Sequence, residues 1–138
     1  KAGRVPAEID LFVPVFAVAG DSVEERAHML GRTRSQVSFY GSTPNYAFQF
    51  DDLGFTGMTA QLQRLMKTGD MPGMAALITD EMLEHFALIA PWDDMADALK
   101  ARYEGVASRV VTYLTAEDLV RNPQNMGKWG EIARALAD

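Results

Sequence analysis

Four hydroxyl side chains gather in one short segment of the chain, between two predicted helices. The segment covers residues 39–46, and its hydroxyl groups belong to Tyr40, Ser42, Thr43 and Tyr46. Gly41 and Pro44 favour a break between helices, and hydroxyl groups at a break can hydrogen-bond a bound organic molecule. A structural interpretation stays equally open: Thr43 or Asn45 caps the next helix, and the tyrosines only pack. We take the four as candidate substrate-side residues.

The strong catalytic motifs are absent from the sequence. It contains no glycine-rich phosphate-binding loop, no H-E-x-x-H zinc motif and no G-x-S-x-G nucleophile turn. It has no cysteine, which excludes thiolate nucleophiles, disulfides and cysteine-ligated metals. His28 and His85 lie far apart in the sequence, and a lone helical histidine is more often a packing residue. The sequence therefore predicts no metal site, and its catalytic residues stay unknown.

Composition and charge describe an acidic globular chain. It has 138 residues, a net charge of −6 and 48% hydrophobic residues, which is enough for one domain, residues 1–138, with a packed core. Lys and Arg form no run, which argues against nucleic-acid binding and against a membrane surface. The longest apolar stretch is far shorter than the ~20 residues of a membrane-spanning helix. We expect no nucleic-acid or membrane partner and a cytoplasmic location.

Three apolar segments have the character of β-strands. Residues 11–19 carry no charged or hydrogen-bonding side chain, as in a strand buried on both faces in the middle of a parallel sheet. Residues 86–90 and 110–114 are shorter, and the second of these is rich in β-branched side chains. Pro14 is a local conflict because it donates no ladder hydrogen bond. Either a bulge lies there or the strand begins at Val15.

Helical periodicity occupies the rest of the chain. A helix begins at Asp21 or Ser22, where Ser22 and Glu25 have capping-box spacing, and reaches about Phe39. Further helices are predicted over about 45–53, 58–68, 74–86 with a break near Thr79, 91–104 and 125–136. Strands that alternate with helices indicate βαβ units and a parallel sheet. The helical insertion, about residues 21–85, is far longer than an ordinary connection, and such insertions commonly build a pocket.

The order and spacing of four segments resemble the luciferase-like monooxygenase superfamily. They are Ser-Phe-Tyr-Gly-Ser-Thr-Pro-Asn-Tyr (38–46), Asp-Leu-Gly-Phe (52–55), Gln-Leu-Gln-Arg-Leu-Met-Lys-Thr-Gly (61–69) and Met-Ala-Ala-Leu-Ile-Thr-Asp-Glu-Met-Leu-Glu-His-Phe-Ala (74–87). Residues 2–9 are also similar to the segment before the sixth barrel strand of that superfamily. More narrowly, the chain resembles the deazaflavin-dependent branch, which uses coenzyme F-420.

The resemblance implies a fold and an activity. The fold is helix-rich α/β: the C-terminal part of a (β/α)8 TIM barrel, with about three parallel strands plus a helical insertion. The activity is hydride transfer between F-420 and an organic small-molecule substrate. An FMN-dependent monooxygenase of the same superfamily and a non-catalytic α/β interaction module are the alternatives. The resemblance places the cofactor mainly on parts of the enzyme outside this chain, so the cofactor-binding residues stay unknown and the isolated chain is expected to be inactive.

One departure from the family pattern adds a candidate residue. After the seventh strand the family often has Gly-Thr-Pro-Glu-Glu, whereas residues 90–94 here read Ala-Pro-Trp-Asp-Asp. The bulky Trp92 makes a close backbone contact with a ligand doubtful there, and it is instead a candidate to line the pocket.

Three strands cut from a barrel would also leave two bare sheet edges. The first strand, residues 11–19, is expected at or near one of them, and its apolar side chains then favour a homo-oligomer.

Overall fold

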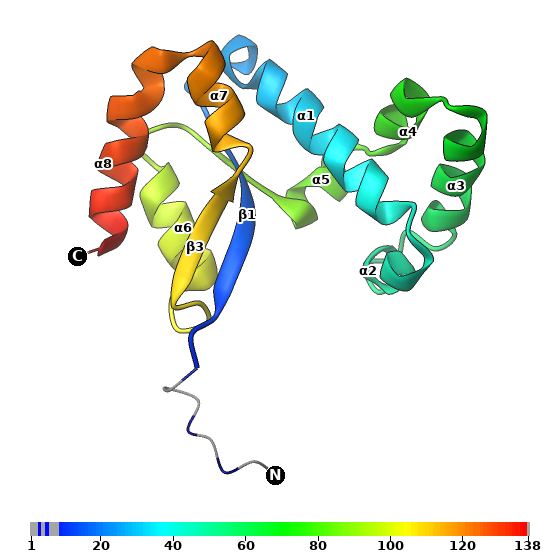
Figure 1. Ribbon diagram of the computed structural model, residues 1–138, viewed down its shortest axis with the longest axis horizontal. Helices are drawn as coiled ribbons and strands as arrows, with labels where there is room; N and C mark the ends of the chain where they lie inside the picture. Colours follow the sequence, from blue (N-terminus) through cyan, green and yellow to red (C-terminus); the bar gives the residue numbers. More distant parts are fainter. Residues whose placement is uncertain (1–2, 4, 6–8, 138) are drawn as a thin grey trace. The chain divides into compact units, whose positions relative to one another are not determined.

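The computed structural model describes residues 3, 5 and 9–137. Its strands are β1 (Phe12–Ala19), β2 (Ala87–Ala90) and β3 (Arg109–Tyr113) (Figure 1). Its helices are α1 (Val23–Gly41), α2 (Ala47–Asp51), α3 (Met58–Thr68), α4 (Met71–Leu77), α5 (Asp80–Phe86), α6 (Met95–Tyr103), α7 (Thr115–Arg121) and α8 (Met126–Ala137), with short turns η2 (Pro44–Tyr46) and η3 (Pro123–Asn125). Of the opening segment 2–9, residues 2, 4 and 6–8 lie outside the described part, as do residues 1 and 138.

The sheet confirms the predicted helix-rich α/β class, with three parallel strands in one sheet. Its order is β2-β1-β3, so the most apolar strand is the central one. The expectation that residues 11–19 lie at or near a sheet edge is therefore wrong. A central strand shares hydrogen bonds with two neighbours, which suits a segment that lacks polar side chains.

Pro14 lies inside β1 without disturbing it. The pairing of β1 with β3 runs unbroken from Phe12 opposite Arg109 to Phe16 opposite Tyr113, with Pro14 opposite Val111. Neither a bulge nor a later start at Val15 is therefore needed. Pro14 is exposed, and its missing N–H is tolerated in an otherwise regular register.

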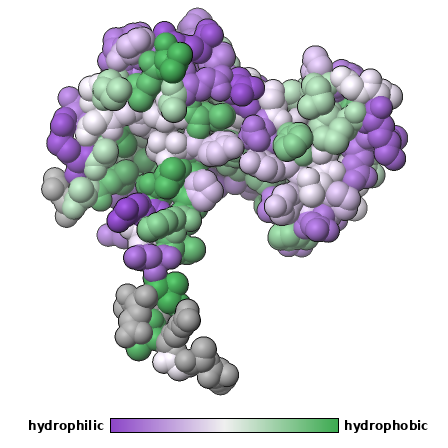
Figure 2. All heavy atoms as spheres, viewed as in Figure 1, coloured by the Kyte–Doolittle hydropathy of each residue, from purple (hydrophilic) through white to green (hydrophobic). Residues whose placement is uncertain are grey.

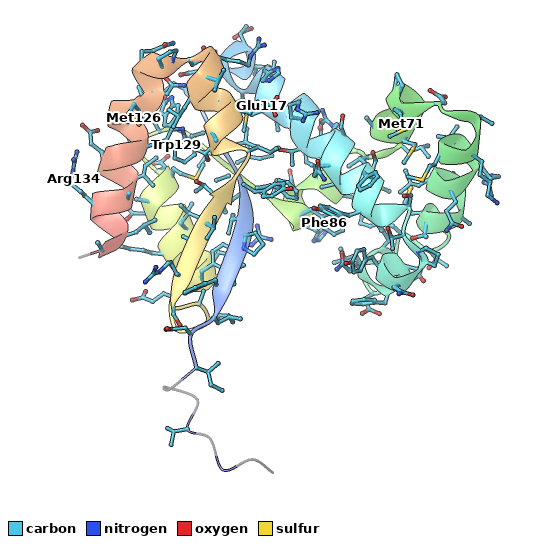
Figure 3. The ribbon with its side chains drawn as sticks, in the orientation of Figure 1. Met71, Phe86, Glu117, Met126, Trp129 and Arg134 are labelled. Carbon is cyan, nitrogen blue, oxygen red and sulfur yellow. The ribbon has the colours of Figure 1, made fainter. Side chains whose placement is uncertain are left out.

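The chain forms two compact units. Unit 1 comprises residues 1–26 and 88–138, and unit 2 comprises residues 27–87. In unit 1, one face of β1 packs against α6 and α8 through a cluster of buried side chains: Val15, Ala17, Ala19, Ala90, Trp92, Met95, Ala96, Leu99, Trp129 and Ile132. Burying a side chain the size of Met95 or Leu99 contributes roughly 1.5–3 kcal/mol. Figure 3 shows Trp129 on the inward side of α8 and Arg134 on the opposite side.

The sequence predicted burial on both faces of β1, but its amino-terminal half remains open. Phe12 is 53% exposed, and Val111 on the neighbouring strand is 51% exposed. The Arg109 guanidinium carbon lies 4.9 Å from the centre of the Phe12 ring, which gives this aromatic side chain a cation–π contact. Apolar side chains also reach the surface elsewhere in the visible face of both units (Figure 2).

Unit 2 is helical and has its own core. Its largest fully buried side chains are those of Phe50, Leu62, Met74, Ile78 and Leu83. An ion pair between Arg34 and Asp80, together with a 3.2 Å hydrogen bond from Arg34 Nε to the Ile78 carbonyl, fastens α1 to the start of α5.

The first helix is longer than predicted, because it ends at Gly41 instead of near Phe39. Gly41 is fully packed: a Cβ atom placed there would overlap the Phe50 ring and come within 3.0 Å of Leu62 Cδ1. The missing side chain therefore lets the last turn of α1 approach α2 and α3 closely.

Local sequence signals account for the helix boundaries that were predicted correctly. Glu25 N–H donates to Ser22 Oγ at 3.1 Å, which confirms the cap of α1. Met82 N–H donates to Thr79 Oγ1 at 3.2 Å, and the helical stretch is interrupted at Thr79 as expected. The sequence analysis missed α7, which begins after Leu114, a residue with φ 69°. Such a left-handed backbone is costly for leucine and makes the sharp turn out of β3.

Candidate functional site

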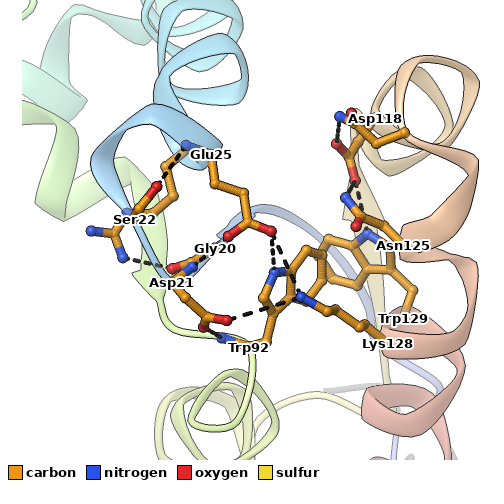
Figure 4. Close-up of polar contacts among 11 residues, drawn as sticks. Gly20, Asp21, Ser22, Glu25, Trp92, Asp118, Asn125, Lys128 and Trp129 are labelled. Carbon is orange, nitrogen blue, oxygen red and sulfur yellow. Dashed lines mark hydrogen bonds and ion pairs between the residues drawn. The ribbon is translucent and has the colours of Figure 1, made fainter.

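A polar cluster lies where β1 and β2 end, at the carboxyl edge of the sheet. Gly20 N–H donates to the Ala90 carbonyl at 3.2 Å and holds the two strand ends together. Just beyond them, Trp92 N–H donates to Asp21 Oδ1 at 3.1 Å, and the Trp92 indole Nε1–H donates to Glu25 Oε1 at 2.8 Å (Figure 4). The first turn of α1 is thereby fixed to the chain that follows β2.

Two cations belong to this cluster: Arg26, whose Nη1–H donates to the Gly20 carbonyl at 2.8 Å, and Lys128 on α8. Lys128 is the one that faces the carboxylates. Its Nζ lies 3.7 Å from Glu25 Oε1 and 4.0 Å from Asp21 Oδ2. It also lies 4.8 Å from the centre of the Trp92 ring, a cation–π distance. The ammonium group is therefore shared between two carboxylates and an aromatic face.

Glu25 is held as a carboxylate. The indole hydrogen bond from Trp92 lowers its pKa, and the backbone N–H of Asp21, which donates to Glu25 Oε2 at 2.8 Å, and the charge of Lys128 lower that pKa further. A carboxylate that accepts two hydrogen bonds is a fixed acceptor near neutral pH. It orients Trp92 and Asp21, and it is poorly suited to donate a proton.

A second group of side chains adjoins the first through two indole rings. Trp129 packs edge-on against Trp92, with ring centres 5.2 Å apart. The buried carboxylate of Asp118 accepts from Trp129 Nε1 at 3.2 Å, from Asn125 Nδ2 at 3.1 Å and from Asn122 Nδ2 at 3.0 Å. Three neutral donors thus satisfy Asp118 inside unit 1, and they tie α7, η3 and α8 together (Figure 4).

The cluster contains one of the sequence candidates, Trp92, which is 6% exposed. The sequence analysis identified Glu25 only as a helix cap and did not identify Lys128 or Asp118. The Thr-x-x-Asp spacing of Thr115 and Asp118 could have signalled a helix start near α7, although Leu114 and not Thr115 is the N-cap residue. No local pattern could have signalled that Asp118 meets Trp129, because their contact depends on how α7 and α8 fold back on each other.

The four hydroxyl candidates all belong to unit 2, at the end of α1 and in η2. The rings of Tyr40 and Tyr46 are neighbours, with centres 6.4 Å apart, and both are about two-fifths exposed. Ser42 is buried, and its hydroxyl donates to the Phe39 carbonyl at 2.7 Å. Thr43 occupies the N-cap position of η2, but its side chain makes no capping hydrogen bond.

A groove of about 410 Å³ lies beside this segment. It is lined from α1, the following turn and α3 by Phe39, Ser42, Thr43, Pro44, Gln63, Met66 and Lys67. The structure therefore brings Ser42 and Thr43 to one groove, with Tyr40 and Tyr46 adjoining in the chain. Gln63, Met66 and Lys67 of α3 complete the lining of this groove. No local sequence pattern predicts them, because they join the groove only through the packing of α3 beside the end of α1.

Unit 1 has a larger groove, of about 660 Å³, between α6, β3 and α8. Its lining includes Leu99, Tyr103, Val110, Trp129 and Ile132, which makes it mainly apolar. The Thr115 hydroxyl at its wall is buried without a hydrogen-bond partner in the described part of the chain. The sequence analysis did not predict this groove.

Among residues 3, 5 and 9–137, no three His, Cys, Asp or Glu side chains are placed to hold one metal ion. Within the same residues, none of the helices is both long and apolar enough to cross a membrane.

Comparisons with known proteins place the chain in a family. The family model described as luciferase-like monooxygenase matches residues 1–109. Uncharacterized proteins of Mycobacterium bovis and Mycobacterium tuberculosis are 37% identical to it over 116 residues, which are 84% of this chain and 34% of each relative. The chain thus spans about a third of the length of these relatives. No solved structure matches it significantly. Since the family model covers most of its length, the chain belongs to the luciferase-like monooxygenase family.

Proposed function

We propose that this chain is the C-terminal part of a luciferase-like oxidoreductase that transfers a hydride between coenzyme F-420 and an organic substrate. The proposal is supported mainly by the family match over residues 1–109. The parallel sheet, which has polar side chains at its carboxyl edge, agrees with it. Enzymes with parallel α/β sheets place their sites at that edge. The F-420 branch itself is proposed from the resemblance of residues 38–46, 52–55, 61–69 and 74–87.

The ends of β1 and β2 do not fit a phosphate-bearing cofactor, and the Arg26 guanidinium there already donates to the Gly20 carbonyl. The backbone N–H groups of Asp21 and Trp92 already donate to side chains of the chain itself. Lys128 lies within 4.0 Å of two carboxylates, and a phosphate group there would face the negative charges of Asp21 and Glu25. We therefore assign cofactor binding to the part of the enzyme that corresponds to the remaining length of the relatives.

The role proposed for this chain is on the substrate side. Tyr40, Ser42, Thr43 and Tyr46 remain the candidates, with the groove beside them as the place where a substrate is held. Trp92 orders the strand ends through Glu25 and Asp21. No catalytic residue is assigned to this chain.

Cofactor titration tests the proposal. The 138-residue chain and the polypeptide encoded by the complete reading frame that contains it would be titrated with F-420 and with FMN, followed by cofactor fluorescence. We expect the longer polypeptide to bind F-420 tightly and the 138-residue chain to bind neither cofactor below micromolar concentration. Binding of FMN alone would favour the monooxygenase alternative. Binding of neither by the longer polypeptide would favour the non-catalytic interaction module.

A conservative variant tests the substrate-side role in the longer polypeptide. Tyr46→Phe removes one exposed hydroxyl, so turnover should fall while the melting temperature stays unchanged. Tyr103→Phe on α6 is the matched control and should change neither. If Tyr46 only packs, kinetics stay unchanged, and any lost hydrogen bond costs about 1 kcal/mol of stability instead.

A further inference from the structure

The groove of unit 2 combines apolar, hydrogen-bonding and cationic side chains in a small space. Phe39 and Pro44 contribute apolar rings, and Met66 contributes a thioether that is only partly buried. Gln63 offers an amide, and Lys67 offers an ammonium group. At about 410 Å³, the groove lies within the range of ~300–1,000 Å³ that is typical of small-molecule sites.

The polar groups of the groove differ in their availability. The Ser42 hydroxyl proton is engaged by the Phe39 carbonyl, and its oxygen lies 3.6 Å from Met66 Sδ. Ser42 is therefore part of the wall. Lys67, in contrast, is exposed and has no ion-pair partner within residues 3, 5 and 9–137. Its ammonium group remains able to meet a ligand at the rim of the groove.

The charge of α3 favours an anion. The helix carries Arg64 and Lys67 and no Asp or Glu, although the whole chain has a net charge of −6. A carboxylate in the groove would thus approach the basic helix of an acidic protein. Such a charge-assisted contact is roughly twice as strong as a neutral hydrogen bond.

Aromatic side chains at and beside the groove favour a planar aromatic ligand. The rings of Phe39 and Tyr40 lie 5.9 Å apart, and the Tyr40 and Tyr46 rings follow at 6.4 Å, which gives a row of edge-to-face contacts. Phe39 is 48% exposed beside the groove, so one ring face or edge remains open to a further aromatic partner. The Met66 thioether is a favourable neighbour for the same ring.

We propose that this groove binds an aromatic carboxylic acid as its anion, with the ring against Phe39 and Met66 and the carboxylate at Lys67. The inference rests on the proposed function, because it names the substrate class that the oxidoreductase would take on this side. Binding itself needs neither cofactor nor turnover, so it is measured on the 138-residue chain.

The test uses naphthoate as the probe and the methionine methyl groups as reporters. In the chain labelled with carbon-13 at its methionine methyls, naphthoate should shift the Met66 signal and leave buried Met74 and exposed Met126 unchanged. Met66→Leu identifies the signal. Lys67→Gln should weaken binding about tenfold, as expected for the loss of one contact to a charged group. Arg121→Gln on α7 removes an exposed positive charge that lines neither groove, and this control should bind naphthoate as the parent chain does.

Further probes decide whether charge and aromaticity both matter. The neutral naphthyl alcohol and the saturated cyclohexane carboxylate should each bind at least about tenfold more weakly than naphthoate. Equal binding by either probe, unchanged binding by Lys67→Gln, or a shift confined to methyls other than Met66 would overturn the inference. F-420 binding by the longer polypeptide, without naphthoate binding by this chain, would leave the proposed function standing and remove only the substrate class.

Discussion

Removing the Glu25 carboxylate should destabilise unit 1 substantially. In Glu25→Ala, the buried Trp92 indole N–H loses its 2.8 Å acceptor, which costs ~1–3 kcal/mol. The Asp21 N–H loses its acceptor too, but it is exposed and water replaces part of that bond. The ion pair with Lys128 contributes little because the Glu25 side chain is 33% exposed. The sum is a loss of about 2–3 kcal/mol in the free energy of unfolding.

Tryptophan fluorescence during urea unfolding measures this loss selectively. The chain has two tryptophans, Trp92 and Trp129, and both belong to unit 1. With a denaturant slope of ~2 kcal/mol per molar urea, the midpoint of Glu25→Ala should fall by about 1 M. Glu25→Gln keeps an oxygen acceptor and should lose about half as much, because the charge-assisted part of the bond disappears.

The comparison variant is Glu131→Ala, which removes an exposed carboxylate from α8 and should stay within about 0.5 kcal/mol of the parent. If the midpoint of Glu25→Ala falls no further than that of Glu131→Ala, the hydrogen bonds of Glu25 do not stabilise unit 1.

Three further predictions concern pH, packing and association. The pKa of Glu25 is lowered below its ordinary 4.5 in the folded chain. The stability that the Glu25 carboxylate contributes is therefore full above pH 4.5 and is lost as the pH falls through the pKa of the folded chain. The urea midpoints of the parent chain and of Glu25→Gln should converge in acid. Gly41→Ala should destabilise unit 2 by about 1–3 kcal/mol, because the new methyl group overlaps the Phe50 ring; amide hydrogen exchange measures the loss. The control Gly31→Ala, on the same helix, places its methyl group where no atom lies within 4 Å and should be neutral or stabilising. The exposed Phe12 and Val111 should make the 138-residue chain dimeric or larger in light scattering at micromolar concentration, and Val111→Lys should shift it toward monomer; a parent chain that is already monomeric would contradict this.

The features that the sequence predicts well are those set by neighbouring residues. Ser22 and Thr79 each accept a hydrogen bond from the N–H three residues later, so the two helix starts are readable from spacing alone. The three strands follow from apolar and β-branched runs. In each case the physical cause lies within one or two turns of the backbone.

The features that the sequence does not predict depend on contacts between distant segments. The apolar run of residues 11–19 indicates a central strand, and the order β2-β1-β3 confirms it, but the open amino-terminal half of β1 depends on which elements cover its faces. The same holds for the site. The Trp92 indole donates to Glu25, which lies 67 positions away in the chain. Asp118 accepts a hydrogen bond from Trp129 because α7, which the sequence did not predict, is followed by η3 and α8.

The division of the chain into units has a consequence for how it folds. Unit 2 is one continuous stretch, whereas unit 1 is assembled from both ends of the chain. The strand-end hydrogen bond from Gly20 to Ala90 must therefore close a loop that contains the whole of unit 2. Closing a flexible loop costs conformational entropy that grows with its length. Helical structure within residues 27–87 forms from short-range contacts and shortens that loop beforehand. We therefore expect unit 2 to fold first and the pairing of the sheet to follow it.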